Sequence, residues 1–262
     1  MLTFIKLGGS LITDKREAQH FQADVMRRAA QEIASARTAN PDLKLLIGHG
    51  SGSFGHVAAQ KYGTMDGVYM PEQWHGFAEV AAVARELNTL VLHTLREVGL
   101  PVLDFQPSAS AQAEGGKLLS MAVEPIRCAL ERDLVPLVYG DVAFDAQRGG
   151  TIISTEAIFF YLAQQLCPAR IMLLGEVEGV LDQAGQIVPL ITPGNLDTIT
   201  TALGGSHGTD VTGGMASKVQ QMIDLVEQVR GLEVRIFGGT QPGQIEAALL
   251  GQIQPGTLIR ND

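Results

Sequence analysis

Glycines and lysines gather at three places in this chain where they could bind phosphate groups. The first is the sequence KLGGS, residues 6–10, which ends an apolar run at the start of the chain. Adjacent glycines let backbone N–H groups approach an anion closely, and Lys6 adds positive charge. Lys15 places a second cation a few residues later. Taken alone, the motif is explained equally well by a tight turn beside a solvated lysine.

The second place is the sequence HGSGSFGH, residues 49–56, which lies between another apolar run and a segment that we predict to be helical. Its glycines, serine hydroxyls and helix N-terminus suit an anion. The glycines also fit the G-x-G-x-x-G spacing of a dinucleotide-binding turn, which needs an acidic residue at a strand end about 20 residues later. The candidate, Glu72, lies in a polar stretch instead. We therefore favour an anion site, with His56 as a hydrogen-bond donor to phosphate rather than a structural histidine.

The third place is the sequence DVTGGMASK, residues 210–218, which brings Lys218 one turn into a predicted helix. A lysine there would neutralise phosphate charge that the helix N-terminus already attracts. An ordinary solvated lysine explains the motif by itself. Because three glycine-rich turns and two associated lysines occur together, we predict a phosphate site.

One carboxylate follows a further strand-like run. Asp141 comes directly after Gly140, beyond the predicted strand Leu134 to Val138. It is either a turn residue or a group that orients the lysines or holds Mg²⁺ through water. The chain has no G-x-x-x-x-G-K-[ST] loop, H-R-D set, H-E-x-x-H or G-x-S-x-G sequence. This absence argues against P-loop and protein kinases, zinc proteases of the H-E-x-x-H type and α/β-hydrolases.

The elements that must position these motifs alternate between short β-branched runs and longer helical segments. This pattern predicts an α/β fold, with a parallel sheet covered by helices on both faces. In such sheets ligands bind beyond the carboxyl ends of the strands, where these glycine turns fall. The predicted strands are Leu2 to Leu7, Leu43 to Ile47, Pro101 to Leu103, Leu134 to Val138, Arg170 to Leu174 and Glu233 to Phe237.

Two helices and one irregular segment stand out between the strands. Apolar residues recur every three or four positions from Phe77 to Val98, which indicates the buried stripe of a long helix. A second helix is predicted from Gly214 to Arg230. The polar segment Leu181 to Thr212 is predicted to form a hairpin and loops. No linker-like stretch divides the chain, so we predict one domain.

Composition restricts the partners. The chain has 262 residues, 45% of them hydrophobic, and a net charge of −9. Its surface is expected to repel nucleic acid and anionic membrane, so an anionic ligand needs a local site. Cys128 and Cys167 lie in apolar segments without metal-ligand spacing, and we predict buried, reduced thiols in a cytoplasmic protein. No apolar run reaches the ~18 residues of a membrane span.

Taken in order, the motifs KLGGS, ITDK, HGSGSFGH, GDV, TIIS and DVTGGMASK resemble the amino-acid kinase superfamily across nearly the whole chain. The pair ITDK and SFGH looks specifically like the isopentenyl phosphate kinase family within it. The resemblance implies a three-layer αβα sandwich with a mainly parallel central sheet, and residues 1–262 as a single domain. It also implies a homodimer that uses ATP and Mg²⁺ to phosphorylate isopentenyl phosphate. The N-terminal part of the chain would bind the acceptor, and the C-terminal part would bind ATP.

The resemblance also assigns residues to roles. Those implied for catalysis are Lys6, Lys15, His56, Asp141 and Lys218. Those implied for the nucleotide and its phosphates are Lys6, Gly8, Gly9, Ser10, Gly52, Glu176, Gly214 and Lys218. Those implied for the acceptor phosphate are Ser51, Gly55, His56 and Gly150. No residue is assigned as a direct metal ligand.

The chain departs from the family pattern at two places. The usual H-G-G-G is interrupted by Ser51, and the usual Ser-Gly-Asp is Ser154-Thr155-Glu156 here. We predict that Glu156 replaces the family's aspartate as the carboxylate that spaces the lysines. Three alternatives stay open: a kinase for a phosphonate of the fosfomycin type, a kinase for a carboxylate or other small acceptor, and a nucleotide-binding regulator without catalysis.

Overall fold

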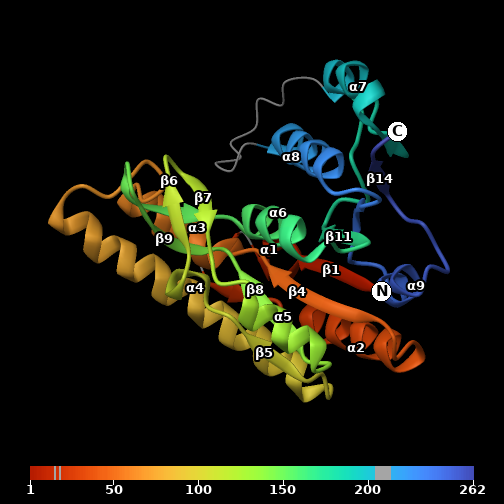
Figure 1. Cartoon of the computed structure of the whole chain (residues 1–262), viewed down its shortest axis with the longest axis horizontal. Coiled ribbons are helices and arrows are strands. Elements are labelled where there is room, and N and C mark those ends of the chain that lie inside the picture. The colour runs from red at the N-terminus through yellow and green to blue at the C-terminus, as the bar shows by residue number, and fades with distance from the viewer. Residues whose placement is uncertain (15, 18, 204–213) are drawn as a thin grey trace.

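The computed structural model describes residues 1–14, 16–17, 19–203 and 214–262, without the side chains of residues 56, 57 and 200–203. Its centre is an eight-stranded sheet with the strand order β12-β14-β13-β11-β1-β4-β8-β5 (Figure 1). All neighbouring strands are parallel except β13 and β14. The strands are β1 Leu2–Leu7, β4 Lys44–His49, β5 Val102–Asp104, β8 Val135–Tyr139, β11 Arg170–Gly175, β12 Leu190–Ile191, β13 Glu233–Gly238 and β14 Thr257–Arg260.

The six predicted strands are confirmed within one or two residues at their ends. Strands of a parallel sheet that is covered on both faces are nearly continuous apolar runs, so they are easy to recognise in a sequence. In β1, every residue from Thr3 to Leu7 is buried. Strands β12 and β14 were not predicted, because β12 has only two residues and β14 alternates between buried and exposed positions.

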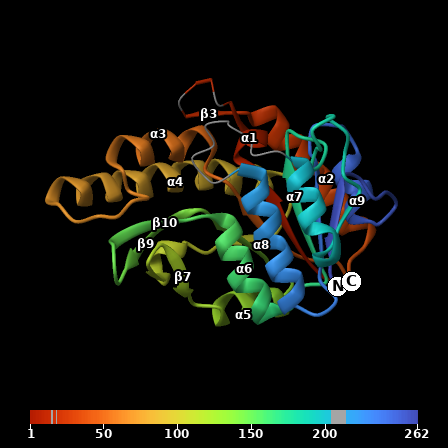
Figure 2. The same ribbon diagram turned by 90° about the horizontal axis from the view of Figure 1, so that it is seen from above.

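Helices cover both faces of this sheet, as expected for an αβα sandwich (Figure 2). Ile5 and Leu7 of β1 face one apolar core, and Phe4 faces the other, where its ring meets Phe159 edge-on at 5.2 Å. The first core includes residues of α1 Gly9–Ile12, α2 Ala23–Ala39, α3 Gly52–Tyr62, α4 Pro71–Glu97 and α9 Gln244–Leu249. The second includes residues of α5 Glu124–Glu131, α6 Thr155–Leu166, α7 Leu196–Leu203 and α8 Gly214–Gln228.

A smaller sheet lies beside the sandwich. Its strand order is β10-β9-β6-β7, and a two-stranded hairpin, β2-β3, lies after α1. The smaller sheet packs against α4, where Phe144 contacts Trp74 and Phe77. The remaining elements are β2 Thr13–Asp14, β3 His20–Phe21, η1 Pro107–Ala109, β6 Gln112–Glu114, β7 Lys117–Ser120, β9 Asp141–Asp145, β10 Gly149–Ile153 and η2 Pro193–Asn195.

The two predicted helices are confirmed, and two other predictions need correction. In the segment from Leu181 to Thr212, a bridge between Leu181 and Ile187 confirms the hairpin, but the prediction of loops alone is wrong because α7 forms there. Residues 204–212 of this segment lie outside the described part.

The prediction of buried thiols is also wrong. Cys167 is exposed, because it ends α6 in a left-handed conformation (φ 47°), and Cys128 is half-buried. Among the described helices, none is long and apolar enough to cross a bilayer.

Glu32 of α2 holds the short helix α9 in place. The Glu32 carboxylate is 7% exposed and accepts hydrogen bonds from the backbone N–H groups of Gly243 (2.9 Å), Ile245 (2.9 Å) and Glu246 (3.3 Å). These donors belong to the first turn of α9, which has no partners for them inside the helix. The negative charge also suits the positive end of the helix dipole.

We expect Glu32→Ala to lower the free energy of unfolding by about 3 kcal/mol, because three backbone donors lose a charged acceptor. Urea unfolding followed by circular dichroism measures the change. Glu246→Ala is the matched control, since the half-buried Glu246 side chain accepts, among the described residues, a single hydrogen bond, from Ser35 (2.6 Å). Equal losses in both variants would contradict the role given to Glu32.

Candidate functional site

The first two glycine-rich motifs meet at the carboxyl end of the central sheet. The Gly8 N–H bonds to the Leu174 carbonyl of β11 (2.8 Å), and the Gly50 N–H bonds to the Leu7 carbonyl of β1 (3.0 Å). A Cβ atom on Gly9 would lie 2.3 Å from the Gly52 nitrogen, and Gly52 has a left-handed φ of 49°. Only glycine fits at these two positions, so the two turns form one continuous backbone surface.

Thr13 fastens the two turns together. Its hydroxyl donates to the Gly9 carbonyl (2.7 Å) and accepts from the Ser53 N–H (2.9 Å), and the side chain is 1% exposed. The ITDK motif therefore contributes through its threonine to the shape of the site. Lys15, the cation predicted from the same motif, lies outside the described residues.

Lys6 and Lys218 face the same carboxylate, that of Glu156. The Lys6 Nζ lies 2.5 Å and the Lys218 Nζ 3.9 Å from Glu156 Oε1. Lys6 is 8% and Glu156 7% exposed, whereas the Lys218 side chain is 34% exposed. Burial raises the pKa of Glu156, but the two lysines outweigh it and the net pKa is below the ordinary value. The carboxylate is therefore ionised, and its position agrees with the prediction that Glu156 spaces the lysines.

The start of α6 places Glu156 there. Ser154 caps the helix by accepting from the Ala157 N–H (3.1 Å), which puts Glu156 in the first turn. The Thr155 hydroxyl donates to the His49 carbonyl at the end of β4 (2.6 Å) and anchors the helix N-terminus to the sheet. A residue 150 positions from Lys6 thus reaches it through one local cap and one tertiary hydrogen bond to the sheet.

A buried polar network lies behind the second turn. The His49 ring stacks on Tyr139 at 5.5 Å, and its nitrogens lie 3.2 Å from Asn88 Oδ1 and 3.1 Å from the Gly50 carbonyl oxygen. The Asn88 amide donates in turn to Asp104 (3.0 Å). Burial lowers the pKa of His49 to about 4, with a further lowering by the Lys6 charge, so the imidazole is neutral near pH 7.

Asp141 has partners other than those expected for it. Its carboxylate accepts from the backbone N–H groups of Ser108 (3.0 Å) and Val142 (2.8 Å), and within the described part of the chain it forms no ion pair with Lys6 or Lys218. Burial raises the pKa of Asp141 despite these hydrogen bonds. The carboxylate that meets the lysines is Glu156. A catalytic role for Asp141 stays a prediction.

The remaining candidates occupy the rims of the two turns. Ser51 is the N-cap residue of α3, but its side chain makes no capping bond to the described helix, and Ser10 is half-buried in α1. Gly55 lies in the first turn of α3, packed against Ser51. His56 follows it in the same helix, and its side chain lies outside the described part.

On the nucleotide side, Glu176 is exposed directly after β11, and Gly214 begins α8 with a φ of 68°. Lys218 follows one turn later, as predicted. Gly150 lies in β10 and packs against the ring of Phe77, where a Cβ atom would come within 2.8 Å. Its surroundings are therefore apolar, unlike those of the glycines in the turns.

Three residues of the site were missed as candidates: Thr13, His49 and Asn88. Asn88 gave the clearest signal, because it is a polar residue on the buried face of α4 between Leu87 and Val91, and it is 1% exposed. A buried polar side chain requires a hydrogen-bonding partner. Thr13 and His49 were part of recognised motifs, but their partners are tertiary contacts.

This arrangement suits the transfer of a phosphoryl group. Such a reaction needs alignment and neutralisation of charge on oxygen atoms more than it needs a protein nucleophile. Two lysines, the joined glycine turns and the N-termini of α3, α6 and α8 supply positive potential at one sheet edge. Glu156 limits the repulsion between the lysines.

Comparison with known proteins agrees with this chemistry. The model of the amino acid kinase family matches residues 1–238. Isopentenyl phosphate kinases of Methanothermobacter thermautotrophicus and Methanocaldococcus jannaschii are each 35% identical to the chain, over 98% and 99% of its length and 98% of theirs. A solved isopentenyl phosphate kinase structure superposes with a TM-score of 0.83 at 30% identity, covering 99% of this chain and all of that one. Carbamate kinase from Giardia lamblia shares the fold, with a TM-score of 0.69 at 15% identity.

The His49 network predicts a loss of stability in mild acid. The folded pKa of about 4 lies below the ordinary 6.5, so the unfolded chain binds the proton first as the pH falls. The stability from neutral His49 is therefore complete above about pH 6.5 and is lost toward about pH 4, by up to roughly 3 kcal/mol. Urea unfolding between these pH values measures the loss. His49→Gln, which cannot titrate, should show a shallower dependence, and an equally steep one would contradict the assignment.

Proposed function

The chain belongs to the amino acid kinase family, and we propose that it transfers the γ-phosphoryl group of ATP to isopentenyl phosphate, forming isopentenyl diphosphate and ADP. Relatives that bear the name isopentenyl phosphate kinase match it over nearly the whole length at 33–35% identity. The observation that carries the proposal is the Lys6–Glu156–Lys218 group beside the joined glycine turns. It provides fixed positive charge where a phosphoryl group would pass between two phosphate-bearing molecules.

In the proposed reaction an oxygen of the acceptor phosphate attacks the γ-phosphorus in line with the leaving oxygen of ADP. The new P–O bond forms as the bond to the β-phosphate oxygen breaks. Because the acceptor is already anionic, no side chain has to remove a proton from it. The protein's contribution is alignment by the backbone turns and neutralisation of oxygen charge by the lysines.

We assign roles on the same basis. Lys6, Gly8, Gly9 and Ser10 would hold the transferred and β-phosphates; Gly52, Gly214, Lys218 and Glu176 would contact the nucleotide. Ser51, Gly55, His56 and Gly150 would bind the acceptor. Lys15 and Asp141 remain proposed as further catalytic residues.

Mg²⁺ would arrive with the ATP phosphates, since this ion is usually held through substrate phosphates and water. The two lysines at Glu156, beside the joined glycine turns, fit the phosphates of such a complex. We further propose that residues 1–262 form one domain, which binds the acceptor in its N-terminal part and the nucleotide in its C-terminal part. We also propose that the protein is a cytoplasmic homodimer.

Glu156→Gln should lower kcat by about 100-fold, because Lys6 loses its partner and the two lysines, no longer neutralised, move apart. Glu156→Asp is the control: it keeps the charge, as in the family's usual motif, and should retain more activity than the glutamine variant. Steady-state release of ADP with isopentenyl phosphate measures both. Full activity of Glu156→Gln would reduce Glu156 to a favourable charge at the N-terminus of α6.

The acceptor is tested by a panel read with the same ADP assay: isopentenyl phosphate, fosfomycin and N-acetylglutamate. We expect kcat/KM to be highest for isopentenyl phosphate. His56→Ala should then raise the acceptor KM and lower kcat, because a charge-assisted hydrogen bond worth roughly 1.5 to 3 kcal/mol is removed. ATP affinity, measured by calorimetry with a non-hydrolysable analogue, should stay unchanged.

Two results would count against the proposal. Preference for fosfomycin or N-acetylglutamate would replace the acceptor, and no turnover with any of the three, together with intact ATP binding, would indicate a non-catalytic nucleotide-binding protein. An unchanged KM and kcat in His56→Ala would remove His56 from the acceptor site while leaving the kinase activity standing.

A further inference from the structure

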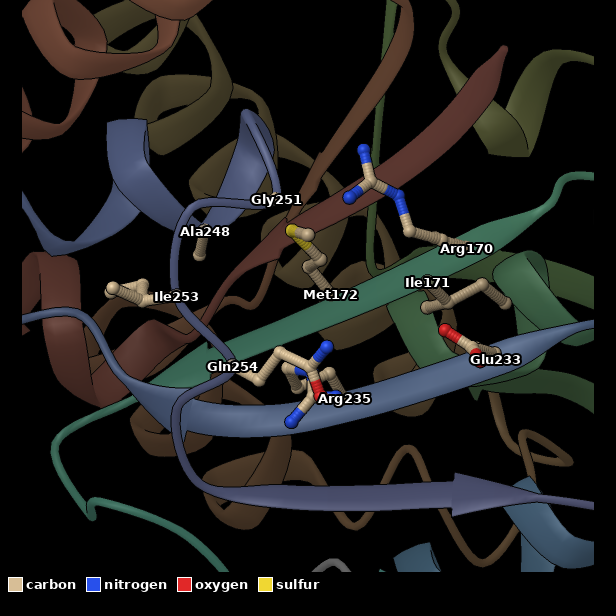
Figure 3. Close-up of a pocket in the computed structure, with 9 residues that line it drawn as sticks. All are labelled: Arg170, Ile171, Met172, Glu233, Arg235, Ala248, Gly251, Ile253 and Gln254. Atoms are coloured by element: carbon tan, nitrogen blue, oxygen red, sulfur yellow. Dashed lines mark hydrogen bonds between the residues drawn. The ribbon is translucent and has the colours of Figure 1, made fainter.

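A small cavity lies at the opposite edge of the sheet from the lysines. It opens where β11 and β13 begin, beneath the end of α9 and the loop that follows it, and has a volume of about 80 Å³ (Figure 3). Figure 3 shows the loop through Gly251, Ile253 and Gln254 running across both strands. The lining residues are Arg170, Ile171, Met172, Glu233, Arg235, Ala248, Gly251, Ile253 and Gln254.

Arg170 enters this cavity with part of its hydrogen-bonding capacity unused. Its Nη2 donates to the Leu249 carbonyl (2.9 Å) and to the Thr3 hydroxyl (3.3 Å), both neutral acceptors. Its Nε is buried and has no hydrogen-bond partner. A buried N–H of a guanidinium without an acceptor is costly. Because the Nε atom is closed to solvent, an anion in the cavity would meet the Nη groups of Arg170 instead.

Arg235 lines the same cavity from the neighbouring strand. Its guanidinium donates to the Pro255 carbonyl (3.1 Å) and to Gln254 Oε1 (3.5 Å), again neutral groups. Among the described residues neither arginine forms an ion pair, and Glu233 is the single carboxylate in the lining. Two arginines and one glutamate leave a net charge of about +1.

The charges of the two arginines are incompletely balanced. Burial lowers the pKa of Arg170, and the nearby Arg235 lowers it further, while Glu233 partly opposes both effects. Burial also lowers the pKa of Arg235. An anion in the cavity would relieve this imbalance, and it would interact strongly because the buried Met172 and Ala248 exclude water on one side.

We propose that this cavity, which Arg170 and Arg235 both line, binds a small oxyanion, a phosphate or a carboxylate. Guanidinium groups match the planar oxygen pairs of both anions and bind them through charge-assisted hydrogen bonds. The cavity is far below the roughly 300 to 1,000 Å³ of sites for larger organic ligands, which excludes a nucleotide or a prenyl chain. The site is separate from the lysine site. Arg170 pairs with Thr3 of β1, and Lys6 lies three residues, or about 10 Å, farther along that strand, an odd spacing that puts the two side chains on opposite faces of the sheet.

The test uses the methyl groups of Met172 and Ile253 as local reporters, because added phosphate would also reach the lysine site. The full-length protein with ¹³C-labelled Met and Ile methyl groups is titrated with inorganic phosphate and, separately, with acetate. Saturable shifts of both reporters by either anion support the proposal, and the tighter anion identifies the class of ligand. The absence of saturable shifts with both anions overturns it.

Three variants make the result specific. Arg235→Gln should weaken binding by about tenfold or more, since one charge-assisted contact is lost. Glu233→Gln should tighten binding severalfold, because it removes the opposing carboxylate. Arg260→Gln is the matched control. Arg260 lies on β14, where it pairs in register with Glu233 of β13, but it is exposed and does not line the cavity. Its replacement should therefore leave binding unchanged. Equal weakening in Arg235→Gln and Arg260→Gln would overturn the site, since it would reflect general surface charge. None of these outcomes depends on kinase activity, which the three variants should retain.

Discussion

Lys6 and Lys218 share one buried carboxylate, and the site at the carboxyl edge of the sheet depends on that interaction. Glu156, which is buried together with Lys6, keeps two like charges close together. Without it, the lysines would repel each other and Lys6 would be an unpaired buried cation, which proteins rarely tolerate. The surrounding structure serves the same end: the Ser154 cap and the Thr155 anchor fix the start of α6, and thereby the carboxylate.

The net charge of the chain makes this local arrangement necessary. With −9 overall, the molecule offers a phosphorylated ligand no general attraction, so positive potential has to be concentrated by particular residues. The backbone turns contribute to this positive potential without adding further side-chain charge. The contact between Gly9 and Gly52, fastened by Thr13, keeps those turns in one arrangement. The positive potential for phosphorylated ligands is thus a local property of the carboxyl edge of the sheet.

The sheet was largely predictable from sequence, and the contacts within the site were only partly so. Strands such as β1 and β11 are apolar throughout, which a sequence displays directly, and the glycine turns follow them. Hydrogen-bond partners are different, because they join residues that are distant in the chain. Glu156 could be proposed as a partner of the lysines through family resemblance, whereas nothing local connects Asn88 with His49. The thiol of Cys167 was misjudged because a helix end, which exposes its last residue, was not foreseen.

The position of β1 has a consequence for how the chain acquires its structure during synthesis. This strand is made first, and β4 can pair with one of its edges as soon as about fifty residues have emerged. The other edge of β1 is covered by β11, which begins more than 160 residues after β1 ends. In the interval the nascent chain carries an apolar strand with an open row of backbone hydrogen-bonding groups, the kind of edge that invites association with other chains. The strand that bears Lys6 is therefore also the one that the growing polypeptide must protect for longest.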